Sequence, residues 1–187
     1  KKGMLRGEQL QTSVETISRS VDQIVTLTND ILFLQEIELV IPEFQPVDIV
    51  EVVNNVIKKY GNKAEERRIT LKLKDSQNIP KVQGDSQSLE RAITALVDNA
   101  IKFSMPNGVV EIRFASQGNK VSISVEDHGI GIDPKLRPRI FDRFVHLERS
   151  GDDLFGGLGI GLSITRQVIQ QHKGSLDVES QFGKGSK

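Results

Sequence analysis

Residues 96–103 read Leu-Val-Asp-Asn-Ala-Ile-Lys-Phe, a helical run that carries Asn99 and Lys102 one turn apart. Two further segments follow: Asp-His-Gly-Ile-Gly at 127–131 and the glycine-rich Gly-Gly-Leu-Gly-Ile-Gly-Leu at 156–162. A glycine-rich loop that opens a helix offers backbone N–H groups to phosphate, a carboxylate on a tight turn can accept a base amine, and an amide oxygen can hold a hard cation. Together the three segments predict a site for ATP with Mg²⁺.

The composition is that of an ordinary globular protein, with 37% hydrophobic and 27% charged residues. The 187 residues allow one compact domain of roughly 140 to 150 residues plus an appendage. Because 25 basic and 25 acidic residues cancel, the charge indicates no nucleic-acid partner. The absence of cysteine excludes disulfides, thiolate catalysis and cysteine metal sites.

The first residues, Lys1 to Arg6, lack the apolar core of a signal peptide, and no apolar run approaches the roughly 18 residues of a membrane span. We therefore expect a cytoplasmic location and no membrane contact from this chain. Anchoring of the full-length protein in a membrane stays open.

Residues 1–41 have a different pattern from the rest. Apolar side chains recur there in alternating steps of four and three residues, a narrow heptad seam, and no proline or glycine interrupts residues 8–41. This pattern predicts a long helix, which we expect to pair with a helix of a partner subunit or of a missing part of the chain, because one narrow seam cannot bury itself. The alternative, a helix lying on its own domain, stays open. The seam consists of Leu10, Val14, Ile17, Val21, Ile24, Thr28 and Ile31.

Two prolines mark residues 42–47 as a linker, and a second domain is predicted over 48–187. Asp48 is a candidate N-cap for a helix that continues to about Arg67 and is loosened at Gly61. Further helices are expected from Ser86, after the cap Asp85, to Phe103 and from Ile160 to Gln171. Strands are expected at Ile69–Lys74, Val109–Ala115, Val121–Val125 and Ser175–Glu179, the middle two joined as a hairpin by Gln117–Asn119.

This order of elements predicts an α+β fold, a two-layer α/β sandwich with helices on one face of a mixed, largely antiparallel sheet. The glycines at 157–161 follow a loop and no Walker lysine is present, so the sequence indicates neither a Rossmann unit nor a P-loop.

Five ordered segments resemble the N, first glycine, F, second glycine and final glycine boxes of sensor histidine kinases of two-component systems. The part from Phe44 to Lys187 is similar to their catalytic ATP-binding domain, of the fold shared with gyrase-type ATPases and chaperones, without its last strand. Leu10–Glu38 is similar to the second helix of the dimerisation and histidine-phosphotransfer hairpin. The five segments are Asn99–Phe103, Asp127–Gly131, Ile140–Phe144, Gly157–Leu162 and Gly183–Ser186.

The resemblance implies that Asp127 accepts the adenine N6 amine, while Gly129 and Gly131 let the backbone approach the base. Asn99 would hold Mg²⁺ and, with Lys102 on phosphate, would form the catalytic pair. The alternatives are an ordinary turn aspartate, a core amide and a solvated lysine.

Phe103 is expected near the base, with a core position as the alternative. The glycine segment would present N–H groups to the triphosphate and form the remaining nucleotide-binding positions. These are Gly157, Leu158, Gly159, Gly161 and Leu162.

Three features depart from the family pattern. Ala95 stands where histidine kinases commonly have another asparagine and gyrase-type ATPases have the glutamate that activates water. His146 stands where arginine is common, so that Arg143, Arg149 or a charged histidine would supply the cation of the lid over the phosphates. No histidine lies on the heptad helix, and His172 is expected to cap the end of a helix.

We therefore expect the catalytic part of a sensor histidine kinase, which transfers the γ-phosphoryl group of Mg-ATP to a histidine on a dimerisation helix missing from this chain. In the full protein the expected partners are a second copy, through the N-terminal helix, and the receiver domain of a response regulator. The alternatives are a nucleotide-binding regulatory module with little catalysis and an ATPase of the gyrase or chaperone type.

Overall fold

The computed structural model describes residues 7–40, 42–145 and 159–187, and the chain divides into two compact units, residues 1–40 and residues 41–187. The first unit is the helix α1 (Gly7–Leu39), which confirms the long helix predicted from the heptad seam. In α1 the seam residues Leu10 to Ile24 are each more than half exposed, from 51% for Val21 to 63% for Ile17. The helix therefore presents an apolar stripe to its surroundings.

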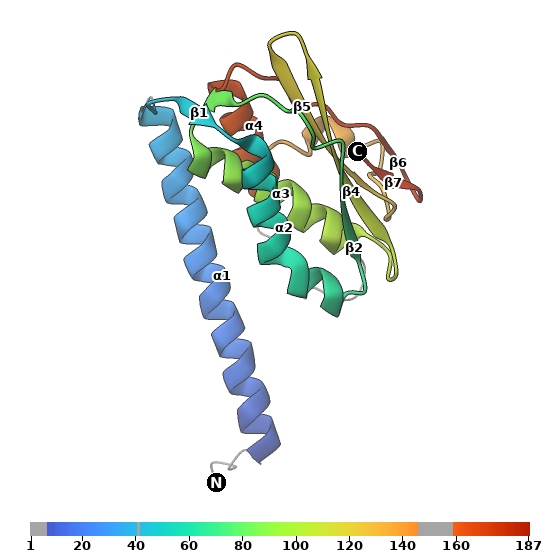
Figure 1. Ribbon diagram of the computed structural model, residues 1–187. Helices are drawn as coiled ribbons and strands as arrows, with labels where there is room; N and C mark the ends of the chain where they lie inside the picture. The colour runs from blue at the N-terminus through green and yellow to red at the C-terminus, as the bar shows by residue number, and fades with distance from the viewer. Residues whose placement is uncertain (1–6, 41, 146–158) are drawn as a thin grey trace. The chain divides into compact units, whose positions relative to one another are not determined.

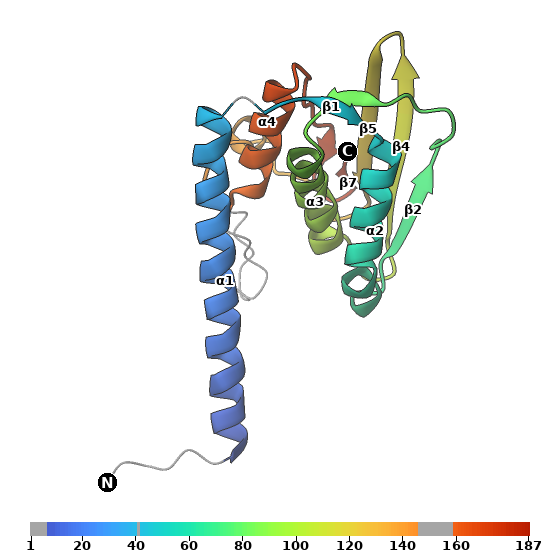
Figure 2. The same ribbon diagram turned by 60° about the vertical axis from the view of Figure 1, so that its left-hand side comes forward.

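The second unit is a two-layer sandwich, as predicted (Figure 1). Its five-stranded sheet has the order β2-β4-β5-β7-β6, in which only β2 and β4 pair in parallel. Three helices lie together on one face of this sheet (Figure 2): α2 (Ile49–Glu66), α3 (Ser86–Phe103) and α4 (Gly161–Gln171). The strands are β2 (Thr70–Lys74), β4 (Val109–Gln117), β5 (Lys120–Asp127), β6 (Ser180–Gln181) and β7 (Gly185–Ser186).

Side-chain caps fix where two of the helices begin. Asp48 accepts hydrogen bonds from the N–H groups of Val50 and Glu51, both at 3.1 Å, ahead of α2 (Ile49–Glu66). Asp85 does the same for α3 (Ser86–Phe103) through Ser88 N–H at 2.7 Å. Both caps were predicted. The predicted loosening at Gly61 was wrong, because α2 is continuous through that residue.

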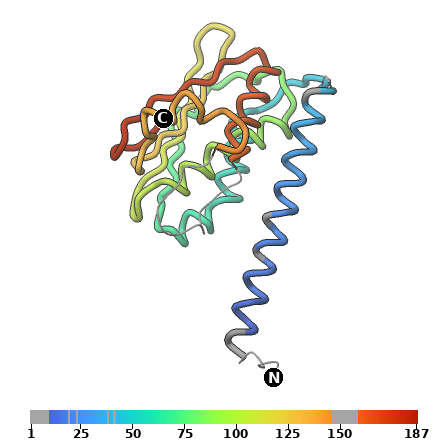
Figure 3. The backbone as a smooth tube through the Cα atoms, turned by 180° about the vertical axis from the view of Figure 1, so that it is seen from behind, coloured from blue at the N-terminus to red at the C-terminus, as the bar shows by residue number. Residues whose placement is uncertain are grey.

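The core lies between the sheet and the helices. Val110, Ile112 and Phe114 alternate along β4 and are buried on the helix side, as the period of two in a strand requires. Val97 and Ile101 of α3 are fully buried in the same unit. The hairpin of β4 and β5, residues 109–127, pairs over its full length and projects at one end of the unit (Figure 3).

The shortest strands differ from the prediction. Residues 45–47, assigned to the linker, form β1 (Gln45–Val47), which pairs antiparallel with β3 (Val82–Gly84). The strand expected at Ser175–Glu179 was wrong: β6 begins at Ser180, and of the preceding stretch only Glu179 pairs its backbone, with Lys187. The last helix, α4, begins at Gly161 and ends at Gln171. Within the described ranges no helix has both the length and the apolar character that a membrane crossing requires.

Candidate functional site

Asp127 lies at the end of β5, where the strand enters the first glycine turn. Its Oδ1 accepts a hydrogen bond from Gly129 N–H at 2.8 Å, and the N–H of Ser186 in β7 donates to the same carboxylate. Burial raises the pKa of Asp127, and these two backbone bonds oppose that shift. The carboxylate is therefore held in one orientation while it remains partly shielded from water.

The glycines of this turn are required by close backbone approaches. A Cβ at Gly129 would lie 2.0 Å from the carbonyl oxygen of Phe103, and one at Gly131, whose φ is +65°, would lie 2.2 Å from that of Gln181. The N–H of Ile130 donates to the Phe103 carbonyl at 3.2 Å. The turn is thus joined directly to the end of α3.

Asn99 and Lys102 lie one turn apart on α3 and are half-buried. No hydrogen bond joins the Asn99 amide to another residue in the part of the chain that the structure describes. The Lys102 ammonium lies 4.7 Å from the centroid of the Phe103 ring, and burial lowers its pKa. An amide and a desolvated cation therefore stand beside the turn that holds Asp127, and an arriving anion would favour the charged form of the lysine.

Charged side chains of α2 flank the stripe of α3 that is formed by Asn99 and Lys102. The sequence alone did not reveal this feature. Lys63 pairs with Asp98, and Arg67 donates to the carbonyl of Lys102 at 3.0 Å. Asp98 raises the pKa of Lys102, whereas Lys63 and Arg67 add to the lowering effect of burial. The spacing of four residues between Lys63 and Arg67 places both on one face of α2 and could be read from the sequence. Nothing in the sequence showed that this face lies against α3.

The second glycine segment is described only from Gly159 onward, so Gly157 and Leu158 lie outside the described residues, as do His146 and Arg149. Gly159 has φ +66°, and its carbonyl accepts a hydrogen bond from Phe144 N–H at 2.9 Å.

Gly161 opens α4, and a Cβ there would lie 3.2 Å from the Cβ of Ala95. Leu162 follows and is half-buried. Because Ala95 is one turn before Asn99, the start of α4 lies beside the stripe of α3 that carries the amide.

No group of three histidine, cysteine, aspartate or glutamate side chains that could cage a metal occurs among the described residues. Mg²⁺ usually binds to one or two protein oxygens together with substrate phosphates, and it keeps several waters. The amide of Asn99, which has no hydrogen-bond partner among the described residues, fits such a role.

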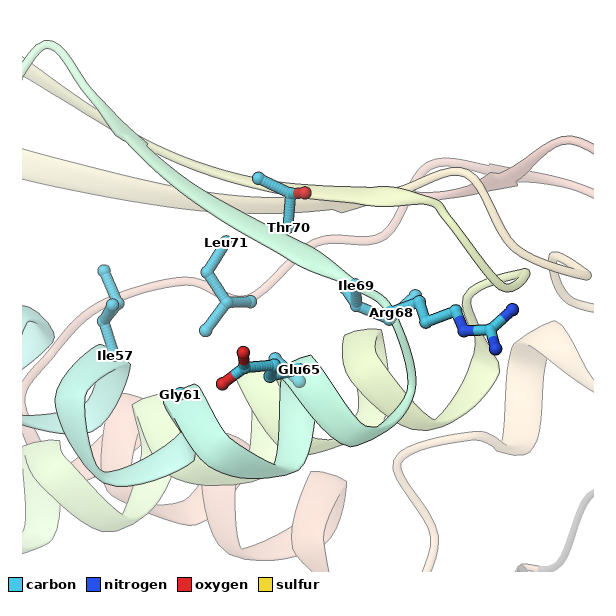
Figure 4. Close-up of a pocket in the computed structure, with 8 residues that line it drawn as sticks. Ile57, Gly61, Glu65, Arg68, Ile69, Thr70 and Leu71 are labelled. Atoms are coloured by element: carbon cyan, nitrogen blue, oxygen red, sulfur yellow. The ribbon is translucent and has the colours of Figure 1, made fainter.

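A separate hollow of about 490 Å³ lies between α2 and β2 (Figure 4). Ile57, Ile69 and Leu71 give it an apolar lining, and Glu65 and Arg68 add charged groups. None of the predicted site residues lines it. The hollow is therefore distinct from the surface formed by α3, the Asp127 turn and α4.

Comparison with known proteins identifies the family. Residues 84–187 match the model described as histidine kinase-, DNA gyrase B-, and HSP90-like ATPase. The chain belongs to this family. The match spans the Asp127 turn, the α3 stripe and the glycines before α4.

Relatives place the chain among sensor histidine kinases. It is 32% identical to the alginate biosynthesis sensor protein KinB of Pseudomonas aeruginosa over 93% of this chain and 29% of that protein. The solved structure of full-length ShkA in complex with AMPPNP covers 98% of this chain and 38% of its own, with 28% identity and a TM-score of 0.79. A mycobacterial sensor histidine kinase, MprB, is 31% identical over 76% of this chain and 92% of its own, with a TM-score of 0.65.

These matches confirm the predicted family and fold. The chain spans less than a third of KinB and 24% of the circadian input-output histidine kinase CikA of Synechococcus elongatus, to which it is 29% identical.

Proposed function

We propose that this chain binds Mg-ATP and, within a longer protein, transfers the γ-phosphoryl group to a histidine outside this chain, for relay to a response-regulator receiver domain. The observation that carries the proposal is the hydrogen bond from Ile130 N–H to the Phe103 carbonyl, because it joins the carboxylate turn to the helix end with the amide and the lysine. The family match and the AMPPNP complex of ShkA support it.

In this proposal each group has one task. Asp127 accepts the adenine amine, Gly129 and Gly131 admit the base against the backbone, and Phe103 lies beside it. Lys102 and the N–H groups of Gly159 and Gly161 neutralise phosphate charge, with Gly157, Leu158 and Leu162 completing the contact.

Mg²⁺, held by Asn99, would supply charge neutralisation on the phosphates. Phosphoryl transfer needs little covalent chemistry from the protein, so positioning and charge supply most of the effect. In the step itself, an acceptor imidazole nitrogen bonds to the γ-phosphorus, and the bond from that phosphorus to the bridging oxygen breaks, which releases ADP.

In this proposal the acceptor histidine comes from another segment; His146 lies outside the described residues. His128 is exposed in the adenine turn, and His172 is enclosed at the end of α4. We propose that the acceptor belongs to a helix that pairs with α1 in a dimer, which would also give the apolar stripe of α1 its cover.

The binding half of the proposal is tested by calorimetric titration of Mg-ATP. Asn99→Ala and Asp127→Asn should each weaken binding by roughly 1 to 3 kcal/mol, because each removes one polar contact. Asn55→Ala, on the exposed face of α2, and Asp133→Asn, elsewhere in the loop after the turn, are the matched controls. Binding of both site variants with unaltered affinity would overturn the site, and Asn99→Ala alone should lose the dependence on Mg²⁺.

The transfer half is tested with radiolabelled ATP and a separately supplied dimerisation hairpin. Label on the hairpin supports the kinase, whereas tight binding without label favours the regulatory module. Steady release of inorganic phosphate would favour the gyrase-type ATPase. The methyl group of Ala95 next to Gly161 argues against that alternative, because it offers no base to activate water.

A further inference from the structure

Three of the contacts between α3 and α4 show how the two helices lie against each other. At one end the N–H of Asp85 donates to His172 Nε2 at 3.0 Å. In the middle Thr165 Oγ1 lies 3.3 Å from the Ala92 carbonyl and 3.0 Å from the Gly161 carbonyl of its own helix, so its one proton is shared between them. At the first residue of α4, Gly161 lies close to Ala95 in the middle of α3. The helices are therefore antiparallel, and the end that begins at Gly161 lies beside the stripe of Asn99.

His172 is the most constrained of these contacts. Its Nδ1 lies 2.8 Å from the Val168 carbonyl and its Nε2 accepts from Asp85 N–H, so the bonds require a neutral ring with the proton on Nδ1. A Cβ at Gly84 would lie 2.8 Å from the imidazole. The ring also stacks on Phe44, with centroids 4.5 Å apart and planes 15° apart.

We infer that His172 is a positioning residue for nucleotide binding: it fixes the register of α4 on α3, and Phe44 holds its ring in place. The inference rests on the proposed nucleotide site. Phe44 belongs to the segment that leads from α1 into β1. A change in how Phe44 packs on His172 would therefore displace the first residues of α4.

The physical reason why His172 would affect the distant start of α4 is that α4 itself is rigid. A helix of this length moves as one body, so loss of the bond at His172 allows α4 to shift along α3 or tilt about Thr165. Either motion displaces the N–H groups at Gly161 from Asn99. A phosphate chain that must meet both is sensitive to such a displacement.

Two substitutions at His172 separate this role from simple packing. His172→Gln keeps an acceptor near the position of Nε2 and so keeps the bond to Asp85. His172→Asn keeps a donor near Nδ1, for Val168, and loses the bond between the helices. Gln170→Asn, at an exposed position in the last turn of α4, is the matched control.

Calorimetry with Mg-ATP on the whole chain should give a dissociation constant about tenfold higher for His172→Asn. The Gln variant should stay within about threefold of the unaltered chain, and the control should not differ from it. Hydrogen exchange should be faster at the Asp85 amide in the Asn variant only. Phe44→Leu should shift the ¹⁵N resonances of His172 and raise the dissociation constant, which tests the inference even if the Asn variant fails to fold.

Equal losses in the Gln and Asn variants would overturn the inference, since packing alone would then explain them. Unaltered affinity in both His172→Asn and Phe44→Leu would do the same while the proposed function stood. Failure of the unaltered chain to bind Mg-ATP would instead overturn the proposed function, and this inference with it.

Discussion

Two properties of Asp127 change in opposite directions with pH: its contribution to the stability of the folded state and its proposed binding of adenine. Burial raises its pKa above the ordinary aspartate value of 3.8, so the folded state favours the protonated form. The stability contributed by this group is therefore full below the unfolded pKa and is lost as pH rises through the folded pKa. The proposed contact with adenine would prefer the charged acceptor and so would change in the opposite direction.

We predict that Mg-ATP affinity falls as pH is lowered through the raised pKa of Asp127, beginning above the pH at which a free aspartate protonates. Titrations across acid pH measure this fall. The Asp127→Asn chain should lack that step because its amide does not ionise. An identical pH profile in both chains would assign the step to a group other than Asp127.

Gly61 gives a second prediction, on stability. A Cβ added there meets nothing within 4 Å, since the residue faces the open hollow between α2 and β2 (Figure 4). Gly61→Ala should raise the free energy of unfolding by about 0.5 to 1 kcal/mol, because alanine loses less backbone entropy in a helix. Urea unfolding measures it. Gly129→Ala is the opposing case and should destabilise, because its Cβ would overlap the Phe103 carbonyl.

Among the elements, those with a local signal could be predicted from the sequence. The helices α2 and α3 have aspartate caps and a clear apolar period, and both begin where predicted. The strands β1, β3 and β7 are two or three residues long, too short for alternation to appear. Residues 175–179 alternate but do not form a strand. Alternation could not show this, because strand pairing depends on a neighbour that the sequence does not identify.

The residues of the candidate site also fall into those that a local motif predicts and those that it does not. Asp127, Asn99 and Lys102 stand in segments with recognisable motifs. The N–H of Ser186 and the side chain of Arg67 come from distant elements, and only the folded chain brings them to the site.

The exposed stripe of α1 leads to a prediction about association. Unburied apolar surface costs roughly 25 cal/mol per Å², so the chain should self-associate weakly through this helix. Ile17→Asp with Ile24→Asp should make it monomeric in sedimentation velocity, while Mg-ATP binding stays near normal. Thr16→Asp with Thr26→Asp, exposed and off the seam, is the control. Persistent association of the double isoleucine variant would exclude this stripe as the contact.

For the whole molecule, nucleotide binding should appear as stability. A ligand that binds only the folded state at about 100 times its dissociation constant adds about 2.7 kcal/mol to the free energy of unfolding. Mg-ATP should give this increase in urea unfolding of the chain. Asp127→Asn should show a smaller increase at the same concentration, and an equal one would mean that the stabilising site lies elsewhere.

The bond from Ser186 to Asp127 also has a consequence for biosynthesis. Asn99 and Lys102 leave the ribosome long before β7, and at 5 to 20 residues per second the delay from Lys102 to Ser186 is about 4 to 17 seconds. During that interval the Asp127 carboxylate lacks one of its donors, and the turn after β5 lacks the backbone of Gly185 against it. A nascent chain stalled before β6 should therefore fail to be retained on immobilised ATP, and the ability to hold nucleotide should arise only when translation has passed β7.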